Sequence, residues 1–253
     1  MGNQFSIFDY TRQPFAINKP IRMVELFAGY GSQSMAMERV GVDTVCYKAI
    51  EVDKYAMESF NQVHGTDFKP TDICDVKGSD LEIIDKDKYC YILTYSFPCT
   101  DISVAGQMQG MAEDSNTRSS LLWQVKRILS ELNETDSLPQ VLLMENVPAI
   151  ISPINKPHYQ KWLDFLDSLG YSSYNEILNG CDFGIAQNRE RMFCVSLLGN
   201  YNYKFPNPME LRKCMEDYFE DLTEEQALQL IVKSEKARDL LVELDEKGEL
   251  SKL

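Results

Sequence analysis

The chain has 253 residues, 44% of them hydrophobic, which is enough for one sizeable buried core with an appendage. Its formal net charge of −14 excludes a protein whose affinity for nucleic acid comes from a broad basic surface, since such a surface needs an excess of Lys and Arg. No run is apolar for long enough to cross a membrane, and the seven cysteines show no C-x-x-C spacing. We therefore expect a soluble, cytoplasmic protein without a disulfide framework or a bound metal.

A polar lead-in of residues 1–20 precedes a strand predicted over residues 21–27, which runs into a turn with Gly29 and Gly31. Helical spacing follows over residues 33–39. This order is typical of a nucleotide-type site, because glycines let a ligand approach the backbone and a helix N-terminus offers unpaired N–H groups. Ser34 stands where the dinucleotide fingerprint has a third Gly or Ala, so the turn alone does not decide the ligand.

A second strand, over residues 44–50, ends just before Glu51 and Asp53. They follow the glycines by about twenty residues, the distance at which a carboxylate binds ribose hydroxyls in such folds. We assign Glu51 to the ribose and Asp53 to the N-cap of a helix over residues 54–63. A short third element is expected near Asp72 and Ile73.

The apolar, β-prone run over residues 91–100 stops at Pro98 and Cys99. A thiol at the end of a parallel strand lies where open α/β sheets bind their ligands, and cysteine is the most nucleophilic side chain near neutral pH. The alternative is that Cys99 is a small buried hydrophobic residue. We take Cys99 as the candidate nucleophile.

Helices over 118–132 and 159–169 alternate with strands over 140–144, 171–178 and 191–198, which predicts a doubly wound α/β domain. The strand at 140–144 leads into Glu145 and so brings a carboxylate to the same sheet edge as Cys99. Arg189 and Arg191, two residues apart at the start of the last strand, are expected on one side, where they suit a phosphate or a base edge. The alternative is a salt-bridged surface, with Glu145 as a helix cap.

In this order the motifs resemble those of the DNA (cytosine-5)-methyltransferase family over most of residues 21–208. The matching segments are Leu26–Gly31, Glu51–Asp53, Asp72–Ile73, Phe97–Cys99 with Ser103 and Gly106, Thr117–Leu122, Glu145–Val147 and Gly184–Arg191. The resemblance implies a Rossmann-like S-adenosylmethionine-dependent fold, with a mostly parallel, doubly wound sheet and an added antiparallel strand. It also implies a DNA-methylating, restriction-modification type of enzyme acting on double-stranded DNA.

The resemblance gives the site residues their roles. Cys99 would attack C6 of a flipped cytosine, Glu145 would hold N3 and the exocyclic amine, Arg191 would orient the base, and Arg189 would support its loop. The methyl group would pass to C5 and leave S-adenosylhomocysteine. The implied cofactor site consists of Phe27, Gly29, Gly31, Glu51, Val52, Asp72, Ile73, Pro98 and Leu121.

Residues 209–253 are predicted to form an acidic tail of short helices, in which we find no target-recognition region. Its apolar positions are expected either to lie on a solvated surface or to dock a partner: Leu228, Leu230, Ile231, Leu240, Leu241 and Leu244. Two functions stay open, the catalytic part of a split or truncated methyltransferase with a second polypeptide, and a non-catalytic S-adenosylmethionine-binding or regulatory relative. An RNA substrate is less favoured, because the corresponding RNA family carries its nucleophile in a Thr-Cys step where this chain has Asn146 and Val147.

Overall fold

The computed structural model describes residues 12–99, 111, 118–210, 215–231 and 233–248. Ser103, Gly106 and Thr117, which belong to the resemblance above, lie outside these residues. The chain divides into two compact units, residues 1–210 and 211–253. Each unit is described by itself.

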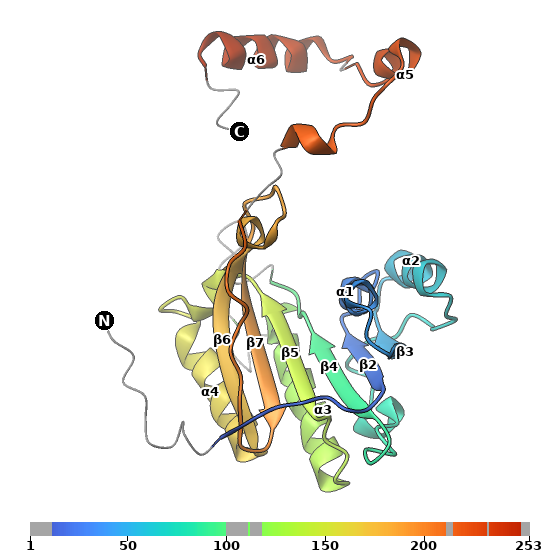
Figure 1. The fold of residues 1–253 in the computed structure, drawn as a ribbon, viewed down its shortest axis with the longest axis vertical. Helices are drawn as coiled ribbons and strands as arrows, with labels where there is room; N and C mark the ends of the chain where they lie inside the picture. The colour runs from blue at the N-terminus through green and yellow to red at the C-terminus, as the bar shows by residue number, and fades with distance from the viewer. Residues whose placement is uncertain (1–11, 100–110, 112–117, 211–214, 232, 249–253) are drawn as a thin grey trace. The chain divides into compact units, whose positions relative to one another are not determined.

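The first unit is built on a sheet of six described strands in the order β3-β2-β4-β5-β7-β6 (Figure 1). The strands are β2 (Ile21–Leu26), β3 (Thr44–Ile50), β4 (Cys90–Tyr95), β5 (Val141–Asn146), β6 (Tyr171–Asn179) and β7 (Glu190–Leu198). Strands β3, β2, β4 and β5 run parallel, and β7 is antiparallel to both β5 and β6. The predicted mostly parallel sheet with one antiparallel strand is confirmed.

Helices connect these strands: α1 (Ser32–Val40), α2 (Lys54–His64), α3 (Leu122–Glu134) and α4 (Lys156–Ser168). Short 3-10 turns complete the connections: η2 (Gly78–Leu81), η3 (Arg118–Leu121), η4 (Pro148–Ile151) and η5 (Gly180–Phe183). Asp53 caps α2 by accepting from the N–H groups of Tyr55 and Ala56, as predicted. Helix α4 begins earlier than the predicted residue 159, because Pro157 fits its first turn, where no N–H is needed. Residues 73–75 form a turn rather than the expected third element.

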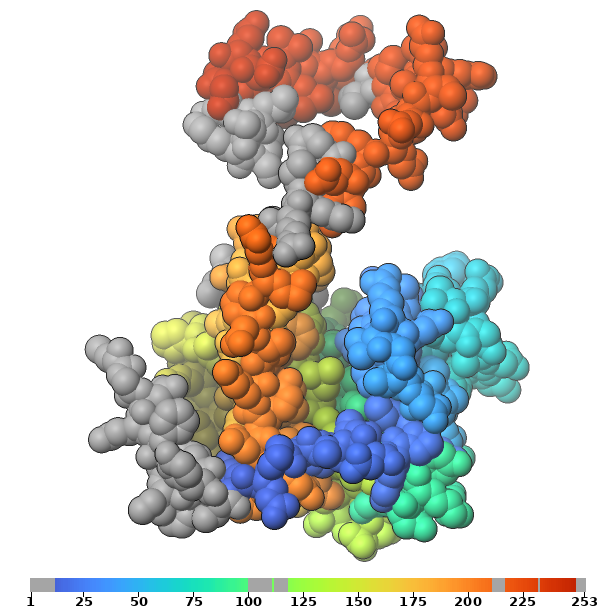
Figure 2. Space-filling view, viewed as in Figure 1, coloured from blue at the N-terminus to red at the C-terminus, as the bar shows by residue number. Residues whose placement is uncertain are grey.

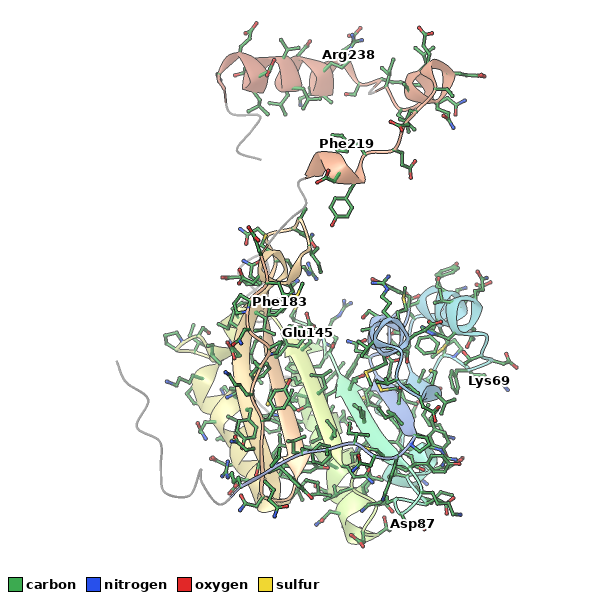
Figure 3. All side chains as sticks on the ribbon, viewed as in Figure 1. Lys69, Asp87, Glu145, Phe183, Phe219 and Arg238 are labelled. Carbon is green, nitrogen blue, oxygen red and sulfur yellow. The ribbon has the colours of Figure 1, made fainter. Side chains whose placement is uncertain are left out.

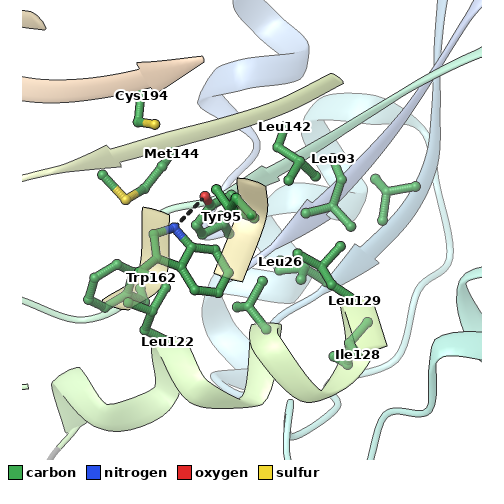
Figure 4. Packing of buried hydrophobic residues seen from close by; sticks show 14 of the residues in the cluster. Leu26, Leu93, Tyr95, Leu122, Ile128, Leu129, Leu142, Met144, Trp162 and Cys194 are labelled. Atoms are coloured by element: carbon green, nitrogen blue, oxygen red, sulfur yellow. Dashed lines mark hydrogen bonds between the residues drawn. The ribbon is translucent and has the colours of Figure 1, made fainter. Parts of the chain in front are cut away.

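The main core lies between the sheet and helices α3 and α4. Leu93, Tyr95, Leu142 and Met144 point from β4 and β5 toward side chains of these helices (Figure 4). Trp162 of α4 is fully buried, and its Nε1–H donates to the Tyr95 hydroxyl over 3.2 Å. Because the indole N–H of Trp162 finds an acceptor inside the core, this contact ties the end of β4 to α4 without leaving that donor unpaired.

The opposite face of the sheet carries a second apolar cluster, of Ile21, Met23, Cys90, Ile92, Val141, Val195 and Leu197. Met37 of α1 packs on it together with aromatic residues from the two ends of the domain, including Phe15 and Tyr201. Strands β1 (Gln13–Pro14) and β8 (Tyr201–Asn202) pair there, and the rings of Phe15 and Tyr201 meet edge to face with centroids 4.9 Å apart. Figure 2 shows the dark blue lead-in lying beside the orange segment. Apolar packing therefore lies on both faces, as a parallel sheet requires.

The second unit contains η6 (Met215–Tyr218), α5 (Glu224–Gln229) and α6 (Glu235–Glu246). Thr223 and Ser234 cap the two α-helices through their hydroxyl groups. The apolar positions singled out above are exposed, except that Leu244 is half-buried. Within the described residues, no helix combines the length and the apolar character that a membrane span needs.

Candidate active site

The candidate site lies where β2, β3, β4 and β5 end side by side. Glu145 marks this carboxyl edge of the sheet, whereas Asp87, just before β4, lies at the opposite edge (Figure 3). Five of the nine predicted cofactor residues directly follow β2 or β3, and Pro98 follows β4 together with Cys99. One sheet edge therefore brings the predicted cofactor-binding and reacting groups together.

The turn after β2 is tightly wound. Phe27, Gly29 and Gly31 have positive φ values of 57°, 56° and 85°. A Cβ built on Gly31 would lie 2.1 Å from Nε2 of His64 and 2.8 Å from Cε2 of the buried Phe60, which disfavours any larger residue, whereas a Cβ on Gly29 would meet no described atom within 4 Å. Among the described residues, no atom blocks the approach of a ligand to the backbone at Gly29.

Glu51 is bound directly to this turn. Its Oε2 accepts from the N–H of Gly29, and its Oε1 accepts from the N–H of Asp53, each over 2.9 Å. Its backbone carbonyl accepts from the N–H of Thr71 over 2.7 Å, which brings the loop with Asp72 and Ile73 close to the end of β3. A carboxylate has about four acceptor sites, so Glu51 keeps capacity for two further donors.

The other predicted cofactor residues differ in exposure. The side chain of Val52 is 65% exposed, and Asp72 is also exposed. Ile73 is buried at 4%, while Phe27, Pro98 and Leu121 are half-buried. Val52 and Asp72 are thus accessible, Ile73 belongs to the main core, and the contacts of all these residues with a cofactor stay predictions.

Cys99 is half-buried beyond the end of β4 and packs against the main core. Two other cysteines, Cys46 and Cys90, lie in environments that suppress reactivity. Burial raises the pKa of the thiols of Cys46 and Cys90 to about 11, so both stay protonated at neutral pH. Because the thiolate is the nucleophilic form, these two cysteines are poor candidates.

Glu145 and Arg191 form an ion pair at the end of β5. Glu145 is opposite Phe193 in the antiparallel ladder, and Arg191 is two residues before Phe193, so all three side chains share one face. Nε of Arg191 lies 2.9 Å from Oε1 of Glu145, with both side chains about three-quarters buried (22% and 27% exposed). Nη1 of Arg191 also donates to the carbonyl of Glu190 over 2.7 Å. Two contacts thus fix the guanidinium next to the carboxylate.

Arg189 is placed differently from Arg191. Strand β7 begins at Glu190, so Arg191 lies within the strand and Arg189 in the loop before it, and the expected placement of both side chains on one side stays a prediction. Arg189 is exposed, and its backbone N–H and carbonyl bond to Asn179 Oδ1 and the Gly180 N–H, each over 3.1 Å. Its backbone closes the loop before β7, and the role of its side chain stays a prediction.

Sequence reasoning gave no role to two sets of buried polar groups at this edge. Glu25 of β2 is fully buried, accepts from the hydroxyl of Ser34, and has a pKa raised by burial. The sequence feature that could have indicated Glu25 is a glutamate within an otherwise apolar strand. Asn146 and Ser119 donate to the backbone just before Cys99, and nothing in the local sequence pattern indicates these long-range contacts.

A sequence profile of the C-5 cytosine-specific DNA methylase family matches residues 21–252. The chain belongs to this family. A curated relative of this chain, the type II methyltransferase M2.ScrFI of Lactococcus lactis subsp. cremoris, is 32% identical over 250 residues, which cover 79% of this chain and 68% of the relative. The type II methyltransferase M.HhaI of Haemophilus parahaemolyticus is 34% identical over 78% of this chain and 56% of its own. The orphan methyltransferase M.SssI of Spiroplasma monobiae is 43% identical over a segment that covers 51% of this chain and 32% of that protein.

Solved structures agree with the methylase fold. The EhMeth methyltransferase of Entamoeba histolytica superposes with a TM-score of 0.67 at 16% identity, over 82% of this chain and 62% of that one. The Dnmt2 methyltransferase of S. pombe superposes with a TM-score of 0.57 at 23% identity, over 74% and 52%. The chain spans between about a third and about two thirds of the length of the three curated relatives.

Proposed function

We propose that this chain is the catalytic domain of a DNA (cytosine-5)-methyltransferase in which Cys99 is the nucleophile. The observation that carries the proposal is the position of Cys99 at the end of β4, on the sheet edge where the neighbouring strand β5 presents the Glu145–Arg191 ion pair. A nucleophile and a carboxylate on adjacent strand ends are the two groups that this reaction needs.

The residues at the turn fit S-adenosylmethionine. No described atom lies within 4 Å of a Cβ built on Gly29, which leaves room for a ligand against the backbone, and the carboxylate of Glu51 is held at that turn by the Gly29 N–H. A carboxylate in this place suits two ribose hydroxyls. When bound, the cofactor supplies an electrophilic methyl group.

The chain's own residues then handle the cytosine. Sγ of Cys99 bonds to C6, which moves the C5=C6 electrons toward C5 and makes C5 nucleophilic. Arg191 contacts Oε1 of Glu145, so we assign Oε2 to hydrogen bonding with the base. After methylation, loss of the C5 proton re-forms the C5=C6 bond and expels the Cys99 thiolate. The bound carboxyl lowers the energetic cost of charge that develops on the ring.

DNA recognition draws on further residues in this proposal. A net charge of −14 gives little surface for phosphate contacts, which normally offset the few kcal/mol that base flipping costs. We propose that a target-recognition region, on the same or a second polypeptide, supplies that surface. The two relatives named as type II methyltransferases support a role in restriction-modification.

The test is transfer of labelled methyl groups from S-adenosylmethionine to duplex DNA, followed by nucleoside analysis for 5-methylcytosine. We expect slow transfer by this chain alone, faster transfer when a recognition region is supplied, and none from Cys99→Ser. If cofactor binds but no methyl group is transferred even with such a region present, the non-catalytic alternative replaces this proposal.

A further inference from the structure

Two buried side chains hold the backbone directly in front of Cys99. Nδ2 of Asn146 donates to the carbonyl of Phe97 over 3.1 Å, and Oγ of Ser119 donates to the carbonyl of Pro98 over 2.9 Å. Asn146 is 3% exposed and Ser119 is 0% exposed. The donors come from different elements, the end of β5 and η3, and converge on two consecutive carbonyls.

These bonds replace the sheet ladder where it stops. Strand β4 ends at Tyr95, so the carbonyls of Phe97 and Pro98 have no strand neighbour to bond with. Pro98 also lacks an N–H, which removes one donor that could anchor the segment. Because buried carbonyls need partners, side chains from outside the strand must supply them, and their positions set the path of the chain toward Cys99.

Asn146 ties the nucleophile's segment to the carboxylate. Its Oδ1 accepts from the N–H of Val147 over 2.9 Å, which fixes the orientation of the amide group. Its neighbour in the chain is Glu145, and its bonding partner Phe97 is two residues before Cys99. The side-chain amide of Asn146 thus connects the segment that carries Cys99 to the segment that carries Glu145.

We propose that Asn146 and Ser119 are positioning residues that set the Cys99 thiol relative to Glu145 and the base. The inference rests on the proposed function and extends it from the reacting groups to their support. A reacting group displaced by about 1 Å can slow a reaction about 100-fold while substrate binding persists. The loss should therefore appear in the chemical step and not in cofactor affinity.

The assay follows covalent capture of DNA in which 5-fluorocytosine replaces cytosine. Fluorine at C5 leaves no proton to remove, so the Cys99–C6 bond persists after methylation. Ser119→Ala and Asn146→Asp each remove one donor, and Asn146→Asp keeps the acceptor for Val147. The matched control is Ser196→Ala, which removes an equally buried hydroxyl that bonds to Ser173 on β6 and lies in the body of the sheet.

At saturating DNA and S-adenosylmethionine we expect capture to slow about 10- to 100-fold in Ser119→Ala and Asn146→Asp. The dissociation constant for S-adenosylmethionine and the half-saturating DNA concentration should stay within about twofold of those of the unaltered chain. Ser196→Ala should lower the unfolding midpoint but leave the capture rate unchanged. If Asn146→Asp does not fold, the capture rates of Ser119→Ala and Ser196→Ala are compared instead, and slower capture in Ser119→Ala supports the positioning role.

Equal slowing in all three variants, or no slowing in Ser119→Ala, would overturn the positioning role. The proposed function has its own controls, the unaltered chain and Cys99→Ser. If the unaltered chain captures no DNA, the proposed function is rejected, and this inference is rejected with it. If capture requires Cys99 but its rate is unchanged in Ser119→Ala and Asn146→Asp, the positioning role is rejected and the proposed function stands.

Discussion

Replacing Gly31 by alanine tests the cofactor turn and offers a matched control on the same helix. Gly31 is the N-cap of α1 and Gly41 its C-cap, and both are left-handed, with φ of 85° and 74°. A Cβ on Gly31 would lie 2.1 Å from His64 Nε2 and 2.8 Å from Phe60 Cε2, while a Cβ on Gly41 would meet no atom within 4 Å. The two substitutions share the backbone strain and differ in crowding.

The expected magnitudes follow from these contacts. Left-handed backbone at a residue with a Cβ costs about 1–2 kcal/mol, which applies to both variants. Crowding adds about 1–3 kcal/mol at Gly31. His64 is half-buried and can turn aside, but Phe60 is fully buried and cannot yield without disturbing the core. We expect Gly31→Ala to lose about 2–5 kcal/mol of unfolding free energy, and Gly41→Ala about 1–2 kcal/mol.

Urea unfolding gives the two free energies, and calorimetry at a temperature where both variants are folded gives S-adenosylmethionine affinity. Gly31→Ala should also weaken cofactor binding at least about tenfold, because the turn that contacts the ligand must shift, while Gly41→Ala should bind normally. Equal losses of stability in the two variants would refute the argument from His64 and Phe60. Unchanged cofactor binding by Gly31→Ala would refute the placement of the ligand at this turn.

Three further predictions concern single carboxylates and their partners. Glu51→Ala should weaken S-adenosylmethionine binding by about 1.5–3 kcal/mol in calorimetry, because charge-assisted hydrogen bonds to ribose are lost; Glu58→Ala, an exposed carboxylate on α2, is the control, and equal affinities would reject the ribose assignment. Arg191→Met should lower methyl transfer on the order of 100-fold, and because it leaves the largely buried Glu145 without its partner it should also lower the free energy of unfolding by up to about 3 kcal/mol, so transfer is measured at a temperature at which the variant is folded. Lys48→Met, which breaks the 2.9 Å pair with Glu82, should leave transfer unchanged, and a similar loss in both would point to stability alone. Burial raises the pKa of Glu25, so its protonated form stabilises the fold below its ordinary pKa, and this contribution is lost as pH rises through the raised value. Relative to Glu25→Gln, the unaltered chain should therefore be more stable at pH 5 than at pH 7.5 in urea unfolding, and a pH-independent difference would contradict the assignment.

Local patterns predicted the parallel part of the fold well. The strand over 44–50 was bounded correctly, because a β-prone run there stops at a helix cap, Asp53, that the sequence shows directly. The Gly-x-Gly turn was also predicted correctly, because the positive φ and the lack of room at Gly31 both favour glycine. In such cases the deciding interactions lie within a few residues of one another.

Features that depend on the pairing of distant strands could not be predicted from local sequence patterns. The family resemblance predicted an added antiparallel strand, but not that this strand is β7 or that it lies between β5 and β6. Hydrophobic periodicity could not show this, because it is the same in either strand direction. The contact of Arg191 with Glu145 depends on that register, and the start of β7 separates Arg191 from Arg189. The bond from Asn146 to Phe97 joins residues 49 positions apart, so no local pattern encodes it.

The most direct test of the account is to identify the residue that becomes attached to DNA. A long duplex made with 5-fluoro-dCTP in place of dCTP offers every sequence context, so the target sequence need not be known, and irreversible capture accumulates even when turnover is slow. After incubation with S-adenosylmethionine, nuclease and protease digestion and mass spectrometry should find a methylated fluorocytosine nucleotide on the peptide that contains Cys99, and none with Cys99→Ser. Attachment to any other residue, or no attachment by the unaltered chain under conditions where it binds the cofactor, would contradict the assignment of Cys99 as the nucleophile.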